Sequence, residues 1–208
     1  MKILLPLLAV LLLATGCSQK KYFEPKDTSG SFPESAKSIS EKIVNFNRNG
    51  ATLEDGQIIT KEGLKDFKLP EGYQFINYSE TKVIATNNKN KLLINDEKNI
   101  IDVEGIVVAA TLKDNVLAMV FSDNTLALYD IQKKKYLLKE YQTESLANDT
   151  RITNPIFMTN IVLFPTLNGK VVVVELKENK IVKNIVVDAN GTFNNIIYLE
   201  VVNDTLIA

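Results

Sequence analysis

Residues 115–130 read NVLAMVFSDNTLALYD, and this stretch decides the fold class of the chain. Two apolar runs, 116–121 and 126–129, flank the polar pair Asp123-Asn124. Short runs rich in branched and aromatic residues on either side of such a pair predict an antiparallel β-hairpin. Both runs are apolar at successive positions, so we expect strands that are buried on both faces, as in sheets stacked face to face.

The same pattern returns 45 residues later, where residues 160–175 read NIVLFPTLNGKVVVVE. The apolar runs and the turn pairs of the two segments align without a gap. An earlier copy begins near Thr81 and a later one near Asp204. A period of roughly 40–45 residues with about four strands per unit is typical of a β-propeller blade. The alternative is a chance match between two β-rich segments.

The body of the chain, residues 38–208, is therefore predicted to be all-β, built from β-propeller-like repeats of four-stranded antiparallel blades. Segment 38–46 also supports a helix, because Ser38 and Glu41 have the spacing of a capping box. We favour a strand there, because it leads into the hairpin signal Asn49-Gly50.

The number of repeats is low for a closed ring. We count about three units and the start of another in residues 38–208, whereas closed propellers usually have about four to eight blades. Residues 205–208 resemble the middle of a blade. We therefore expect the chain to be the incomplete N-terminal part of a longer propeller.

The N-terminus has the layout of a secretory signal. Lys2 precedes the apolar run 3–13, which is too short to span a bilayer as a helix. The segment Ala14-Thr15-Gly16-Cys17 follows. These residues predict a signal peptide at 1–16, and the polar, punctuated stretch 17–37 predicts a flexible tether. The alternative is an ordinary signal peptide in which the cysteine is incidental.

Composition excludes several classes of function. The chain has 208 residues, 45% of them hydrophobic, and a formal net charge of -1, which argues against binding to nucleic acid. It contains no His and no Trp, and Cys17 is its single cysteine. We find no catalytic constellation, no cofactor motif and no metal-ligand spacing, so we expect no catalytic, cofactor-binding or metal-binding residues and no enzyme activity. Asp102 and Glu104 would share a face of a strand, and solvated surface is the favoured interpretation of such pairs.

One short motif suggests a modification. Residues 188–192 read DANGT, which fits the extended bacterial N-glycosylation sequon with an acidic residue two positions before Asn190. Because Asn190-Gly191 also has the chemistry of a turn, and glycans attach to exposed loops, the two interpretations are compatible.

The segment 14–17 resembles a bacterial lipobox, in which small residues precede an invariant cysteine. The resemblance implies diacylglycerol on the Cys17 thiol, cleavage before Cys17 and acylation of the new amino group, for example by palmitate. In Gram-negative lipoproteins an Asp after the cysteine tends to retain the protein at the inner membrane, so Ser18 favours the outer membrane. Ala14 departs from the pattern, because Leu is commonest at that position.

A lipobox, a polar tether and repeats of this length together resemble the propeller lipoproteins of Gram-negative envelopes. The nearest type is the propeller lipoprotein of the outer-membrane β-barrel assembly machinery (BamB-like), within the quinoprotein-like superfamily and in the Asn/Lys-rich style of Campylobacter or Helicobacter. The Trp signature of quinoprotein-type blades is absent.

The resemblance implies a membrane-anchored periplasmic scaffold that binds envelope proteins, with a role in outer-membrane protein assembly. Two alternatives stay open, a quinoprotein-type propeller enzyme and a surface-displayed adhesin or host-protein binder. We expect the lipid anchor to lie in the outer membrane with the body in the periplasm, and the alternatives are the inner membrane and the cell surface.

Overall fold

A computed structural model describes residues 29, 38–39, 41–143, 149–187, 195–203 and 205–208. The chain divides into two units, residues 1–38 and 39–208, and every strand that is described belongs to the second. Cys17, Asn190, the predicted signal peptide and nearly all of the predicted tether lie outside the described residues. The described residues contain no helix that is long and apolar enough to cross a membrane.

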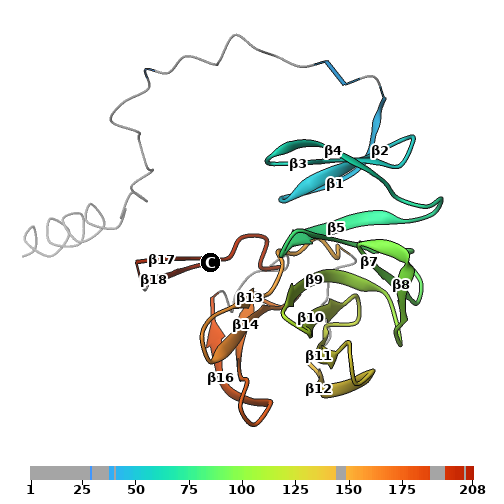
Figure 1. Ribbon diagram of the computed structural model, residues 1–208. Helices are drawn as coiled ribbons and strands as arrows, with labels where there is room; N and C mark the ends of the chain where they lie inside the picture. The colour runs from blue at the N-terminus through green and yellow to red at the C-terminus, as the bar shows by residue number, and fades with distance from the viewer. Residues whose placement is uncertain (1–28, 30–37, 40, 144–148, 188–194, 204) are drawn as a thin grey trace, which may run out of the picture. The chain divides into compact units, whose positions relative to one another are not determined.

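Four antiparallel sheets of four strands follow one another along the chain, and a two-stranded sheet comes after them (Figure 1). In every sheet the strands neighbour each other in chain order. The first sheet is β1 (Ile43–Asn47), β2 (Gly50–Leu53), β3 (Gln57–Thr60) and β4 (Gly63–Lys68). The second is β5 (Gln74–Ser79), β6 (Lys82–Thr86), β7 (Lys91–Ile94) and β8 (Asp96–Asp102). The third is β9 (Val107–Lys113), β10 (Val116–Phe121), β11 (Thr125–Asp130) and β12 (Lys135–Tyr141). The fourth is β13 (Ile156–Phe157), β14 (Ile161–Pro165), β15 (Lys170–Glu175) and β16 (Lys180–Val186), and the last sheet is β17 (Glu200–Val202) and β18 (Thr205–Ile207).

The two hairpins predicted from the repeat are confirmed. Strands β10 and β11 pair antiparallel from Val116 opposite Asp130 to Val120 opposite Leu126. Strands β14 and β15 pair in the same way, and Ile161 lies opposite Glu175. The all-β, propeller-like fold class is confirmed as well, because the described residues form antiparallel meanders of four strands.

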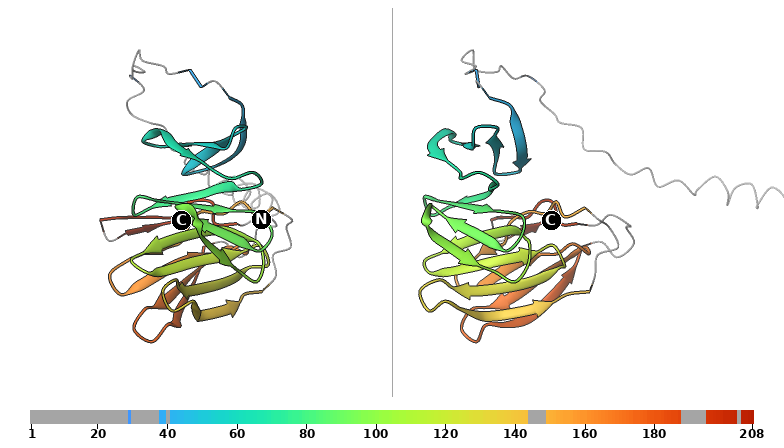
Figure 2. Two further views of the ribbon diagram at one scale, coloured as in Figure 1. Left: turned by 45° about the vertical axis from the view of Figure 1, so that its right-hand side comes forward. Right: turned by 90° about the vertical axis from the view of Figure 1, so that its right-hand side faces the viewer.

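The apolar interior is a series of layers between successive sheets, which stack face against face (Figure 2). Strand β10 shows why its residues are apolar at every position. Leu117 and Met119 pack in the layer toward the second sheet, and Ala118 and Val120 pack in the layer toward the fourth. Because alternate side chains of a strand point to opposite faces, a sheet between two neighbours needs apolar residues at both sets of positions.

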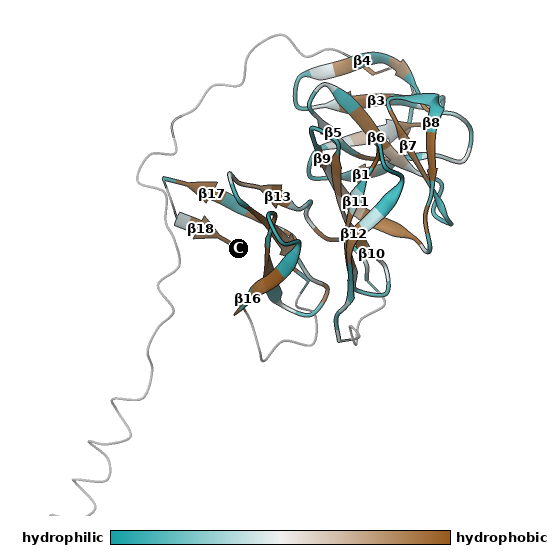
Figure 3. Ribbon diagram, turned by 60° about the horizontal axis from the view of Figure 1, so that its bottom comes forward, coloured by the Kyte–Doolittle hydropathy of each residue, from teal (hydrophilic) through white to brown (hydrophobic). Residues whose placement is uncertain are grey.

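The fourth strand of each four-stranded sheet is more polar and more exposed than the two central strands. Strand β16 carries hydrophilic as well as hydrophobic residues along its length (Figure 3). Lysines recur in these outer strands, for example Lys65, Lys98, Lys139 and Lys183. Charged side chains on an outer strand discourage pairing with another chain.

The structure differs from the sequence prediction in two places. The predicted count was about three units and the start of another, whereas the described residues form four four-stranded sheets and one of two strands. The turn predicted at Asn49-Gly50 is formed by Arg48 and Asn49, because Asn47 pairs with Gly50 at the start of β2. The preference for a strand over a helix near residue 43 is correct.

Candidate functional site: the hub cavity

A cavity of about 900 Å³ lies where the first strands of the first three sheets approach one another. We call it the hub cavity, and its volume is within the range of ligand-binding pockets. Its lining comes from β1 and the following turn (45–48), from β5 (74–76) with Thr86 and Asn88, from 106–108 with Ser122, from segment 149–152, and from Asn195 and Ile197.

Strands β1 and β5 each contribute consecutive residues to the lining, and this indicates how the two strands are oriented relative to the hub cavity. Alternate side chains of a strand point to opposite faces of its sheet. A strand that presented one face to the cavity would therefore contribute every second residue. Strands β1 and β5 instead contribute the consecutive residues 45–47 and 74–76. Their edges, with the backbone groups that are not paired within the sheet, are turned toward the cavity.

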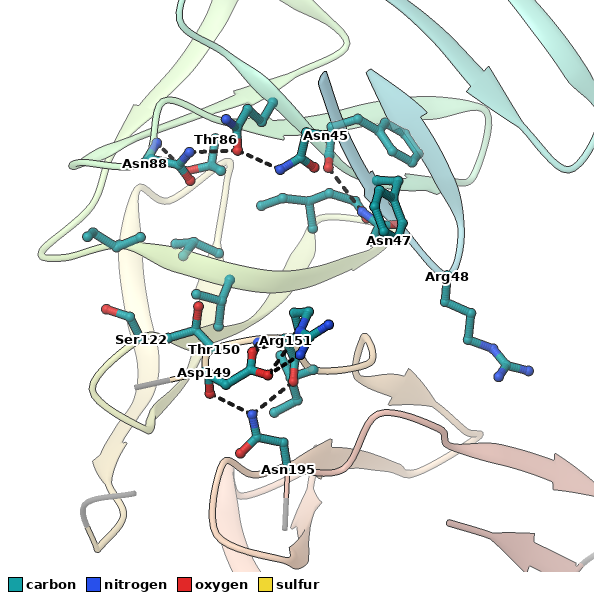
Figure 4. A pocket seen from close by; sticks show the side chains of 18 of the residues that line it. Asn45, Asn47, Arg48, Thr86, Asn88, Ser122, Asp149, Thr150, Arg151 and Asn195 are labelled. Carbon is teal, nitrogen blue, oxygen red and sulfur yellow. Dashed lines mark hydrogen bonds and ion pairs between the residues drawn. The ribbon is translucent and has the colours of Figure 1, made fainter. Parts of the chain in front are cut away.

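Side-chain amides form a row along one side of the hub cavity. The Nδ2 group of Asn45 donates to Oε1 of Gln74 at 2.9 Å, and Nδ2 of Asn88 donates to the same oxygen at 2.7 Å. Asn45 and Asn88 lie opposite Asp149, Arg151 and Asn195 (Figure 4). A primary amide offers donors and an acceptor together, and this is the pattern that a peptide group complements.

The opposite side carries an ion pair between Asp149 and Arg151. The guanidinium Nε donates to Oδ1 and Oδ2 of the carboxylate at 3.0 and 2.9 Å, and Nη2 donates to Oδ2 at 2.5 Å. Arg151 thereby lowers the pKa of Asp149 from 3.8 to about 2. Because the guanidinium side chain is largely exposed, the pair is a feature of the cavity rim.

The side chain of Asn195 holds segment 149–151 in place through hydrogen bonds to its backbone. Its Nδ2 group donates to the backbone oxygens of Asp149 and Arg151, at 2.6 and 3.0 Å. Its Oδ1 atom is buried and has no hydrogen-bond partner within the described part of the chain. Buried acceptors are usually paired, so this oxygen has capacity for one further donor.

Apolar side chains project at the rim of the hub cavity. Phe46 is 76% exposed and Ile197 is 66% exposed, which is unusual for large apolar residues beside a pocket that also contains Ile106. Amides that match peptide groups, combined with exposed apolar side chains, are suited to an extended polypeptide.

A second cavity of about 490 Å³ shares one lining residue, Arg48, with the hub cavity. Arg48 occupies the turn after β1, and its guanidinium carbon lies 3.8 Å from the ring centroid of Tyr198. Its Nη2 atom is 3.8 Å from a carboxylate oxygen of Glu200, which also accepts a hydrogen bond from the Tyr198 hydroxyl. That hydrogen bond raises the pKa of Tyr198. Arg48 thus links the first sheet to the segment before β17.

None of these residues was singled out by the sequence. Both residues that were, Cys17 and Asn190, lie outside the described residues. A usable signal was present in β1, where Asn45 and Asn47 alternate with apolar residues, because Asn is depleted in strands. Within the described residues, no three His, Cys, Asp or Glu side chains are grouped so that they could hold a metal ion.

Comparison with curated proteins gives two related matches. The chain is 29% identical to the plasminogen-binding protein PgbB of Helicobacter pylori in each of two strains, over 97% of this chain and 46% of the relative. The chain therefore spans less than half of the length of these relatives. No family model matches the chain.

Comparison with solved structures supports the propeller fold. BamB from Moraxella catarrhalis superimposes with a TM-score of 0.59 at 11% identity, over 79% of this chain and 56% of that one. The beta-propeller domain of Myceliophteria thermophila Cps50 (Swd1) gives a TM-score of 0.52 at 13% identity, over 81% and 62% of the two chains. At such identities the likeness shows the fold alone. The predicted resemblance to a BamB-like propeller and to Helicobacter proteins is confirmed.

Proposed function

We propose that this chain is a protein-binding scaffold of the bacterial envelope and that its body binds partner polypeptides at the hub cavity. The observation that carries the proposal is the lining of that cavity. It combines the amides of Asn45, Gln74 and Asn88 with the exposed apolar side chains of Phe46 and Ile197. This composition matches a polypeptide better than it matches a small polar metabolite.

The proposal includes a lipid anchor at Cys17. Several acyl chains bind a bilayer far more firmly than one chain does, so the anchor would keep the scaffold at its membrane. Ser18 favours an anchor in the outer membrane, with the body in the periplasm. There the protein would bind envelope proteins that take part in outer-membrane protein assembly. Asn190 is proposed as a glycan attachment site, and mass spectrometry of Asn190→Gln against the wild type tests it.

A second candidate is a host-protein binder displayed at the cell surface. The similarity to two proteins named for plasminogen binding favours it specifically. The two candidates differ in the partner and in the side of the membrane on which the body lies. Protease treatment of intact cells separates them, because only a surface-displayed body would be cleaved.

Binding can be tested with the full chain purified in detergent. We expect it to retain specific proteins from solubilised envelopes, or purified plasminogen under the second candidate. Ile197→Asp places a charge at the cavity rim and should abolish retention. Val182→Asp is the matched control, because Val182 is a 49% exposed apolar residue on the outer strand β16, and it should bind like the wild type. If wild type and both variants retain equal amounts, the hub cavity is not the binding site.

A further inference from the structure

The turn between the third and fourth strands of each four-stranded sheet contains, or leads directly into, a residue with a positive φ. In the first, second and fourth sheets this residue is Gly63, Asn95 and Asn179. Gly and Asn are the residues that adopt this conformation most readily. The third sheet instead has Lys134, with a φ of 52°, at the position in the repeat that corresponds to Asn179.

Lys134 is unfavourable for the backbone at its position. A left-handed conformation disfavours a residue with a long side chain by a factor of about 5–30 in the folding equilibrium constant. The other three sheets avoid this cost with Gly or Asn. A residue held in a sparsely populated conformation points to a function of its side chain, because the fold alone would be better served by another residue.

The turn of the third sheet also differs from the others in its charge. Residues 133–135 read KKK and are all exposed, and we call them the basic turn. The corresponding residues are NDE at 95–97 in the second sheet and KENK at 177–180 in the fourth, so both of those turns contain acidic residues. Lysine is fully charged at neutral pH, and the basic turn therefore concentrates positive charge at one point of the molecule.

A carboxylate within the described residues neutralises only part of this charge. Lys133 forms an ion pair with Asp130 at 3.1 Å. The Oδ1 atom of Asp130 also accepts hydrogen bonds from the backbone N–H groups of Gln132 and Lys133, at 3.0 and 2.8 Å. Lys134 and Lys135 form no ion pair within the described part of the chain, so their charges are presented to the surroundings.

The basic turn lies at the outer corner of the third sheet, because β12 is the outermost strand of that sheet. The second and fourth sheets are both described, and they pack against the two faces of the third. The turn is nevertheless exposed. Its backbone is held in place, because the N–H of Ile131 donates to the carbonyl of Asn115 in the turn between β9 and β10 at 3.0 Å.

We infer that the basic turn binds the anionic headgroups of the membrane to which the chain is anchored. This inference rests on the proposed function, because it needs the lipid anchor at Cys17, and it adds an orientation of the body. The 22 residues from Cys17 to residue 38 span at most about 75 Å, which permits the contact.

The expected strength of the contact suits this role. Each lysine near an anionic surface strengthens binding by a factor of about five, so three lysines give about 150-fold. Such a gain is small for a protein free in solution. It is sufficient to orient a body that an anchor already keeps at the surface, because the anchor supplies a high effective concentration of headgroups.

The test uses the full lipid-modified chain reconstituted in vesicles and measures how fast each lysine is acetylated by acetic anhydride. Vesicles of phosphatidylcholine are neutral, and vesicles with about one third phosphatidylglycerol are anionic. We expect residues 133–135 to react at least about tenfold more slowly in the anionic vesicles. About 1 M NaCl, where the Debye length is about 3 Å, should restore the faster rate. Lys89, an exposed residue in the turn between β6 and β7, should react equally in both.

Three variants locate the contact. Lys134→Asn introduces the residue that the fourth sheet has, so it should raise the folding equilibrium constant at least about fivefold. It should also lower the protection of Lys133 and Lys135 about fivefold, an effect that a merely structural lysine would not have. Lys135→Gln should lower the protection of Lys133 and Lys134 about fivefold without a change at the positive φ. Lys89→Asn is the matched control, because it also replaces one exposed turn lysine by asparagine, and it should leave the protection unchanged.

The outcomes separate this inference from the proposed function. Equal acetylation in the two kinds of vesicle, with the chain still bound to both, overturns the membrane contact and leaves the anchor and the hub cavity standing. Protection of the basic turn by solubilised envelope proteins, but not by anionic vesicles, also overturns it, because the occupant would then be a protein. A chain that does not float with neutral vesicles overturns the anchor, and the membrane contact with it, whereas retention of partner proteins tests the hub cavity independently.

Discussion

Asn124 offers the sharpest test of how neighbouring sheets are joined. It is fully buried in the turn between β10 and β11 and has a positive φ of 66°. Its Oδ1 atom accepts a hydrogen bond from the backbone N–H of Leu167, beyond β14, at 2.8 Å. Its Nδ2 group donates to the carbonyl of Thr143 at 2.8 Å. One side chain therefore ties the turn of the third sheet to the corresponding turn of the fourth.

The cost of Asn124→Ala follows from these contacts. Leu167 is buried, and its N–H would be left without a partner, at about 1–3 kcal/mol. Ala at a positive φ adds about 1–2 kcal/mol, whereas Asn tolerates that conformation. The carbonyl of Thr143 keeps a hydrogen bond from Nδ2 of Asn168 at 3.0 Å, so it adds little. The expected loss of about 2–5 kcal/mol is a large part of the usual stability of a domain, about 5–15 kcal/mol.

Asn124→Gly separates the two contributions. Glycine adopts a positive φ freely but also lacks the amide, so it should be less destabilising than alanine by about 1–2 kcal/mol. Urea unfolding of the full chain, followed by circular dichroism, measures both variants. A loss below about 1 kcal/mol for Asn124→Ala would refute the assignment of Asn124 as a joint between sheets. A glycine variant less stable than the alanine variant would refute the contribution of the positive φ.

Three further predictions concern other parts of the chain. A Cβ atom at Gly50 would lie 2.2 Å from a backbone oxygen of β3, so Gly50→Ala should lower the free energy of unfolding by about 1–3 kcal/mol in the same urea assay. The Asp149 carboxyl should titrate near pH 2 by NMR, and Arg151→Gln should return its pKa toward about 3.9. Because the folded pKa is lowered, the stability from this pair is complete above about pH 4 and is lost as the pH falls toward 2. Cys17→Ser should remove the protein from the membrane fraction or leave it unprocessed, and maturation and membrane binding like the wild type would contradict the lipid anchor.

The hairpins of the third and fourth sheets could be predicted because their strands are buried on both faces. Strand β11 is buried along its whole length, from Thr125 to Asp130, and such continuous burial leaves an unambiguous apolar run. The turns between these strands could also be predicted from local sequence. Asn124 and Gly169 have positive φ values of 66° and 76°, and Asn and Gly are the residues that adopt this conformation most readily.

The first sheet was not recognised as a repeat, and its physical environment explains this. Its strands β2 and β3 have four residues each, and β4 alternates between half-buried and exposed positions. Thr52 is polar where the second and third sheets carry the apolar residues Ile84 and Ala118, because its hydroxyl binds the backbone of β5. A comparison of the sequence with itself, based on apolar runs, therefore found its first copy in the second sheet and missed the first sheet.

The candidate site could not be predicted, because a hub is formed by residues that no single repeat contains. Asn47, Asn77 and Asn154 each bind backbone atoms of a different sheet, between 28 and 78 positions away in the sequence. No local sequence pattern connects such pairs. Asn nevertheless lowers stability in a strand unless its amide forms hydrogen bonds, because Asn is depleted in strands and a buried amide without a partner is unfavourable. A buried Asn in a first strand, such as Asn77 in β5, therefore indicates a backbone group across the hub that its amide binds. By this reasoning Asn47 stands in β1 because its amide covers the hub-facing carbonyls of Phe75 and Ile76 in β5.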